Sequence, residues 1–179
     1  MPEQTIFSLS AIVALVPSSL LPLRKDHSRD MIFWLVLVVA VAGPVNWVLA
    51  SMAGAWRTDL STTLWVTVAA TMAIFAFITI LTRETWRLTP LISAYMVVLG
   101  ILAAVWSQAL HKPLAADTGG WIGVHISVSV ATYALVTIAA VAALAAFLQE
   151  RALKRKRPTA LTRLLPSVAD CEWLLVRLL

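Results

Sequence analysis

Five long apolar runs, separated by short polar segments, make up most of this chain. The runs cover residues 5–23, 31–50, 61–81, 88–106 and 121–149. A helix needs about 20 apolar residues to cross a membrane, because each residue rises 1.5 Å and the hydrocarbon core is roughly 30 Å thick. The pattern therefore predicts an all-α fold: a polytopic membrane bundle of about five transmembrane helices, followed by a basic tail that starts a further helix.

The first run is the weakest of the five as a helix, because Pro17, Pro22 and several serines interrupt it. Membrane helices tolerate proline where neighbouring helices satisfy the freed backbone groups, so the run still counts as a span. The main alternative is a four-span bundle without it. In the second run, Trp34 and Trp47 lie near the two ends, where an aromatic belt at the membrane interface is expected.

Composition supports the membrane assignment over a soluble domain. Apolar residues make up 60% of the chain and charged residues 13%, against about 45–50% and 25% in soluble proteins. The net charge of +5 comes from short clusters between the runs, so it does not indicate a nucleic-acid partner. The single cysteine, Cys171, excludes an internal disulfide framework and is expected to be a small buried residue.

The basic residues predict how the chain is oriented. Three lie in the loop 24–30, two in the turn 82–87 and seven from Arg151 onward, and these twelve of the fourteen fall on one side of a five-span chain. Cytoplasmic loops carry the excess of Lys and Arg. We therefore expect a multi-pass protein of a bacterial inner (plasma) membrane, with its N-terminus outside and its tail in the cytoplasm.

The tail divides the chain into a helix bundle, residues 1–149, and a cytoplasmic segment, residues 150–179. The basic cluster Arg151–Arg157 is expected to rest on anionic membrane lipid. Ser167 and Asp170 have the spacing of a capping box, which predicts a helix start. An amphipathic pattern follows, so the tail is expected to contain an interfacial or spanning helix.

The last apolar run carries the strongest candidate for chemistry. Trp121, His125, Ser129 and Tyr133 are spaced by four and so share one helix face. His125 lies about 6 Å of helix rise below the outer interface, where an ionisable residue is costly and is a functional candidate. A neutral imidazole there can bind a metal such as haem iron, or it can hydrogen-bond a neighbouring helix. The Ser129 and Tyr133 hydroxyls fit helix packing better than catalysis.

Other residue patterns exclude several classes of function. His111 lies in the outer loop, where it is either solvated or able to reach a site above the membrane, and His27 is on the opposite side from His125. The sequence has no Gly-rich phosphate loop, no CxxC and no HExxH motif. The five runs contain no Asp, Glu, Lys or Arg, which argues against an ion-coupled transporter. We expect a protein that is not an enzyme.

Three segments carry a resemblance to a known family: WIGVHISVSVATYA from Trp121, LQERALKRK from Leu148 and LLPSVADCEWLL from Leu164. Together they resemble the cytochrome c assembly membrane proteins, the haem-handling CcsA-type and HemX-like family. In that family a histidine opening this helix is an outer-side haem-ligand candidate, and His125 occupies that position. The resemblance implies haem binding or delivery at the outer face, in cytochrome c-type biogenesis, possible partners being other cytochrome c maturation proteins.

The sequence departs from that family after the resemblance ends. Full-length members continue with further spans and a second histidine, so the chain is expected to be truncated at its C-terminus. Within this chain only His111 could be a second haem ligand, and that pairing is disfavoured. Two other functions remain open: a non-catalytic structural or assembly subunit of a larger membrane complex, and a small-solute transporter.

Overall fold

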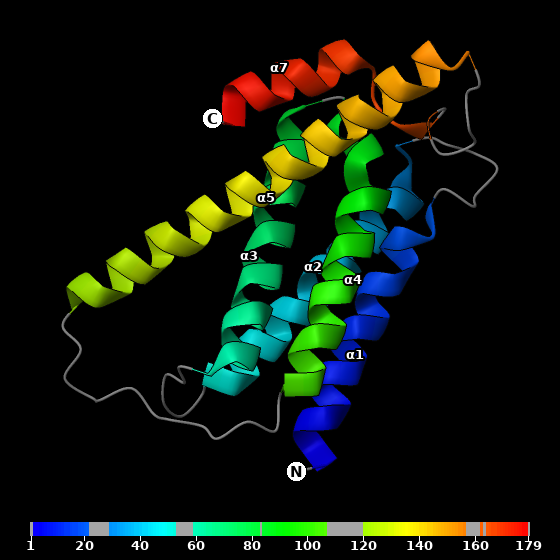
Figure 1. Ribbon diagram of the computed structural model, residues 1–179. Coiled ribbons are helices and arrows are strands. Elements are labelled where there is room, and N and C mark those ends of the chain that lie inside the picture. Colours follow the sequence, from blue (N-terminus) through cyan, green and yellow to red (C-terminus); the bar gives the residue numbers. More distant parts are fainter. Residues whose placement is uncertain are drawn as a thin grey trace.

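The computed structural model describes residues 2–21, 29–52, 59–82, 84–106, 120–156, 162 and 164–178. All regular structure in these ranges is helical. The elements are α1 (Pro2–Ser19), α2 (Met31–Met52), α3 (Leu60–Leu81), the 3-10 helix η2 (Thr85–Leu88), α4 (Thr89–Val105), α5 (Gly120–Lys154) and α7 (Val168–Leu178). Figure 1 shows α1 to α4 side by side, α5 crossing them at an angle, and α7 lying against the later half of α5.

Four of these helices are long and apolar enough to cross a membrane: Met31–Ser51, Leu60–Leu81, Thr85–Val105 and Trp121–Lys154. They correspond to the last four predicted spans, which confirms an all-helical bundle of membrane type. The first predicted span forms α1, whose apolar part, Ile6–Ser19, is shorter than the others. The five-span count therefore stays a prediction where α1 is concerned.

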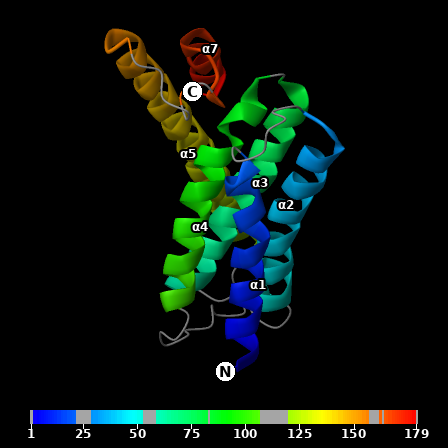
Figure 2. The ribbon, with the colours of Figure 1, turned by 90° about the vertical axis from the view of Figure 1, so that its right-hand side faces the viewer.

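Helix α3 lies at the centre of the bundle and contacts α2, α4 and α5. It contributes four fully buried large side chains to the core: Trp65, Val68, Met72 and Phe75. The core continues into α2 and α4, while α1 packs along both of those helices (Figure 2). Because α3 has neighbours on three sides, its position determines where the other helices lie.

Trp47, which was predicted to belong to an aromatic belt at a span end, points into the bundle. Only 6% of its surface is exposed, and its ring stacks on that of Trp65 with 5.2 Å between centroids. Its indole Nε1 donates a hydrogen bond of 3.1 Å to Ser8 Oγ in α1. A tryptophan near a span end can point inward when a neighbouring helix supplies a hydrogen-bond acceptor, as Ser8 does here.

Among the residues that the structure describes, several basic residues at helix termini lie at the same end of the bundle. Arg29, just before α2, donates a hydrogen bond of 2.6 Å to the backbone oxygen of Thr79, near the end of α3. Its guanidinium also lies 4.8 Å from the centre of the Trp34 ring. The same end holds η2 with Arg87 and the C-terminal turn of α5 with Arg151 and Lys154 (Figure 1). A cation here stabilises the C-terminus of α3, where backbone carbonyls lack partners.

The tail folds back onto the bundle through α7. The predicted capping box is present: Asp170 N donates to Ser167 Oγ at 3.2 Å and Ser167 N donates to Asp170 Oδ2 at 3.3 Å. The apolar face of α7 buries Leu174 and Cys171, which confirms the prediction for the cysteine. Burial raises the pKa of the Cys171 thiol, and the neighbouring Asp170 charge raises it further.

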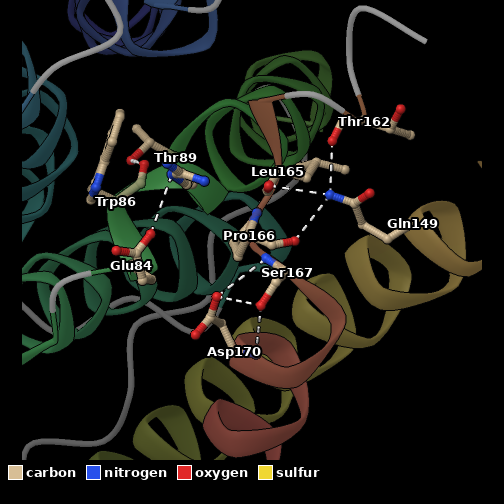
Figure 3. Close-up of polar contacts among 10 residues, drawn as sticks. Glu84, Trp86, Thr89, Gln149, Thr162, Leu165, Pro166, Ser167 and Asp170 are labelled. Carbon is tan, nitrogen blue, oxygen red and sulfur yellow. Dashed lines mark hydrogen bonds and ion pairs between the residues drawn. The ribbon is translucent and has the colours of Figure 1, made fainter. Parts of the chain in front are cut away.

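A single side chain of α5 holds the segment that leads into α7. Gln149 Nε2 donates to three backbone oxygens, those of Thr162 at 2.7 Å, Leu165 at 3.2 Å and Pro166 at 3.1 Å (Figure 3). A buried backbone oxygen needs a hydrogen-bond donor, and the amide of Gln149 donates to all three of these.

Replacing Gln149 with leucine should release α7 and expose Cys171. The leucine keeps the apolar stem but removes the side-chain hydrogen bonds that join α5 to the segment before α7, at a cost of about 1–3 kcal/mol. The measurement is the rate of maleimide labelling, which reports on one site because Cys171 is the only cysteine. Labelling should accelerate, both because the thiol becomes accessible and because its pKa falls toward the ordinary value. Glu150→Gln, on the exposed side of the same helix, is the control and should leave the rate unchanged.

Candidate functional site

The residues singled out in the last apolar run all lie in the first half of α5. Figure 1 shows this half leaning away from the other helices, while the second half packs on α3. Its side chains are correspondingly open: Trp121 is 81% exposed, His125 and Tyr133 are exposed, and Ser129 is half-buried. The four-residue spacing places them along one helix, as predicted, but no second helix of the described chain covers them.

The hydroxyl groups around His125 are satisfied within α5 itself. Ser127 and Thr132 donate to the backbone oxygens of Gly123 and Val128, each at 2.9 Å, and Thr137 donates to that of Tyr133 at 2.8 Å. Such bonds to the preceding turn remove the cost of placing a hydroxyl in an apolar environment. These residues therefore need no partner helix.

His125 differs from its hydroxyl-bearing neighbours, because its imidazole makes no hydrogen bond with any residue that the structure describes. Ser129 and Tyr133 likewise make no hydrogen bond to another described helix. The interhelical hydrogen bonds that were one interpretation of this face are thus not formed within the described ranges. An unpaired imidazole on an apolar membrane helix retains a free nitrogen lone pair for a ligand or a partner protein.

The described residues offer a metal this one imidazole only. Across the described ranges, no group of three or more His, Cys, Asp or Glu side chains could hold a metal ion. His111, the other histidine on the same predicted side, lies outside the described residues. A protein-only metal site, which usually needs three or four ligands, is therefore not formed here, whereas a haem iron already has four ligands from its porphyrin and needs one or two.

The opposite end of the bundle has a feature that sequence patterns did not predict. A cavity of about 470 Å³ lies between α7 and the turn that joins α3 to α4. The capping box and the amphipathic pattern predicted that α7 exists, but the surface it packs on depends on contacts such as those of Gln149, between residues 13 to 17 positions apart. No local pattern in the sequence signals such a contact.

Comparison with known proteins gives one informative relative. The chain is 47% identical, over 185 aligned residues, to a protein of Azospirillum brasilense described as an uncharacterized 28.8 kDa protein in the nifR3-like 5′ region. The alignment covers all of this chain and 68% of that protein. No protein-family model and no solved structure matches the chain.

Proposed function

The chain belongs to the family of the 28.8 kDa Azospirillum brasilense protein, and we propose that it is a membrane component of cytochrome c biogenesis that binds or delivers haem at the outer face of the membrane. The observation that carries this proposal is the imidazole of His125, exposed and without a hydrogen-bond partner among the described residues. The resemblance of the segments around it to haem-handling assembly proteins supplies the identity of the ligand.

The surroundings of His125 suit one face of a porphyrin. Ile122 and Val128 are exposed on the same half of α5, beside Trp121. These apolar side chains would exclude water from an iron–imidazole bond, the kind of bond in which histidine commonly serves as a ligand. When haem is bound, its iron supplies the bond to the imidazole, and this chain's role is to hold that imidazole on a rigid helix.

The orientation in the membrane that this function requires is inferred from the basic residues at one end of the bundle. Arg29, Arg87, Arg151 and Lys154 belong to helix ends that lie together. We place this end in the cytoplasm by the positive-inside rule. The first half of α5, at the other end, then lies at the outer face of a bacterial inner membrane, where c-type cytochromes would receive haem.

The test is the absorption spectrum of the purified chain reconstituted with haem in detergent. Wild-type protein should show a Soret band, and His125→Ala should lower haem affinity by at least the ~10–100-fold that loss of an outer-shell partner causes. His27→Ala, predicted to lie on the other side of the membrane, is the matched control. A Soret band of equal intensity and position in His125→Ala would exclude the role assigned to this residue.

A second function, that of a non-catalytic subunit of a larger membrane complex, is favoured by the exposure of the same half of α5. Its open apolar side chains would pack on a partner helix as well as on a porphyrin. The two functions differ in one measurement. With a photoreactive residue at position 128, which leaves His125 in place, a subunit would cross-link to a partner protein with the same yield whether or not haem is added, whereas in a haem protein added haem should suppress any cross-link.

A further inference from the structure

The cavity between α7 and the turn after α3 has an apolar wall that reaches the surface of the bundle. Leu88 and Leu174 line it and are buried, while Leu81 lines it and is 67% exposed. Leu81 is the last residue of α3, so the apolar wall continues onto the outside of a membrane-spanning helix. An apolar chain lying along α3 can therefore enter the cavity without crossing a polar surface.

Two carboxylates line the same cavity from opposite sides. Glu84 comes from the turn before η2 and Asp170 from the first turn of α7 (Figure 3). Glu84 Oε2 pairs with Arg87 Nε at 3.3 Å, and both side chains are half-exposed. Asp170 uses only Oδ2 for the capping box, and Oδ1 makes no contact with a described residue. Each carboxylate thus keeps an oxygen that can accept another hydrogen bond.

Guanidinium groups lie next to this acidic lining. Arg87 is held by Glu84, and Arg177 lies over the ring of Trp173, which also lines the cavity, at 4.3 Å from the ring centre. Neither arginine lines the cavity itself: the lining combines an apolar wall with two carboxylates, and each guanidinium contacts a lining residue, Arg87 contacting Glu84 and Arg177 contacting Trp173. The volume of about 470 Å³ is within the range of ~300–1,000 Å³ typical of small-molecule sites.

We propose that this cavity binds the headgroup of phosphatidylethanolamine from the adjoining leaflet. The ammonium group donates its three hydrogens to Glu84 and Asp170, and the phosphate accepts from Arg177, with Arg87 beside it. The acyl chains leave along Leu81 and the outside of α3. Phosphatidylcholine lacks the N–H donors, and phosphatidylglycerol lacks the cation, so neither satisfies both carboxylates. This site is independent of the haem proposal, because it lies at the other end of the bundle.

The test measures binding of short-chain phosphatidylethanolamine, phosphatidylcholine and phosphatidylglycerol to the purified full chain by native mass spectrometry. Wild-type protein should bind the ethanolamine lipid about tenfold more tightly than the choline lipid, since it alone makes charge-assisted hydrogen bonds to the carboxylates. Glu84→Gln and Asp170→Asn should each reduce that preference. Glu150→Gln, an acid paired with Lys154 outside the cavity, should not.

Two measurements keep the result interpretable. Protection of Cys171 from maleimide in Asp170→Asn would show that α7 remains docked, since asparagine can still accept the capping bond. If α7 is released, Ala169→Trp, which fills the cavity from the same helix, replaces that variant and should abolish binding of all three lipids. Equal affinity for ethanolamine and choline lipids, tighter binding of phosphatidylglycerol, or a preference that survives Glu84→Gln and Ala169→Trp would each overturn the proposal.

Discussion

Replacing Trp65 with alanine is expected to remove about 3–5 kcal/mol from the free energy of unfolding. The indole is completely buried at the centre of the bundle, where α3 contacts three other helices. One of its faces stacks on Trp47, at an interplanar angle of 27°. Its ring edge lies against α4, so close that a Cβ on Gly100 would come within 3.3 Å of it. Removing the ring therefore leaves a cavity bordered by helices that cannot all collapse into it.

The measurement is equilibrium unfolding in mixed detergent micelles, with Trp121→Ala as the matched control. Trp121 is the most exposed tryptophan of the described residues, so its removal should change stability by no more than about 0.5 kcal/mol. Similar losses in the two variants would contradict the central position assigned to Trp65. If only Trp65→Ala loses stability, the number of tryptophans in a chain does not predict where they lie. A membrane protein places this residue both in its core and at the membrane interface.

The positions of the four long apolar helices could be predicted from the sequence, because they depend on local properties. The third apolar run was predicted at residues 61–81, and α3 covers Leu60–Leu81. Hydropathy is sufficient there, since every backbone polar group of a spanning segment must be paired within its own helix. The start of α7 was equally local, because Ser167 and Asp170 cap the helix through neighbouring backbone atoms.

The contacts between helices could not be predicted in the same way. In a soluble protein, the apolar face of a helix identifies its buried side, but in a membrane the lipid-facing side is also apolar. Trp47 was predicted near a span end, but its sequence position did not show that it would be buried next to Trp65. His125 was placed correctly on one helix, yet nothing in its spacing shows that this part of α5 leans away from the bundle. That geometry follows from where α5 meets α3.

The second half of α5 buries small residues where it packs in the bundle, in a helix that contacts α3 and α7, and enlarging one of them is the second change expected to have a large effect. Ala142 and Ala145 are completely buried on the second half of α5, beside the buried Ile138. Small side chains allow the helix backbones to approach closely. Ala142→Leu adds three carbon atoms to this contact and should destabilise the protein by about 1–3 kcal/mol through overpacking.

Ala143→Leu is the control, because position 143 is exposed. Its added carbons meet lipid or detergent, so unfolding by detergent titration should detect almost no change in stability. Equal destabilisation of the two variants would contradict the assigned contact.

The comparison also bears on the haem proposal. His125 reaches its position only because α5 is one continuous helix, held at its second half. A leucine at position 142 that disturbs this packing should therefore alter haem affinity without touching the ligand, and Ala143→Leu should leave it unchanged.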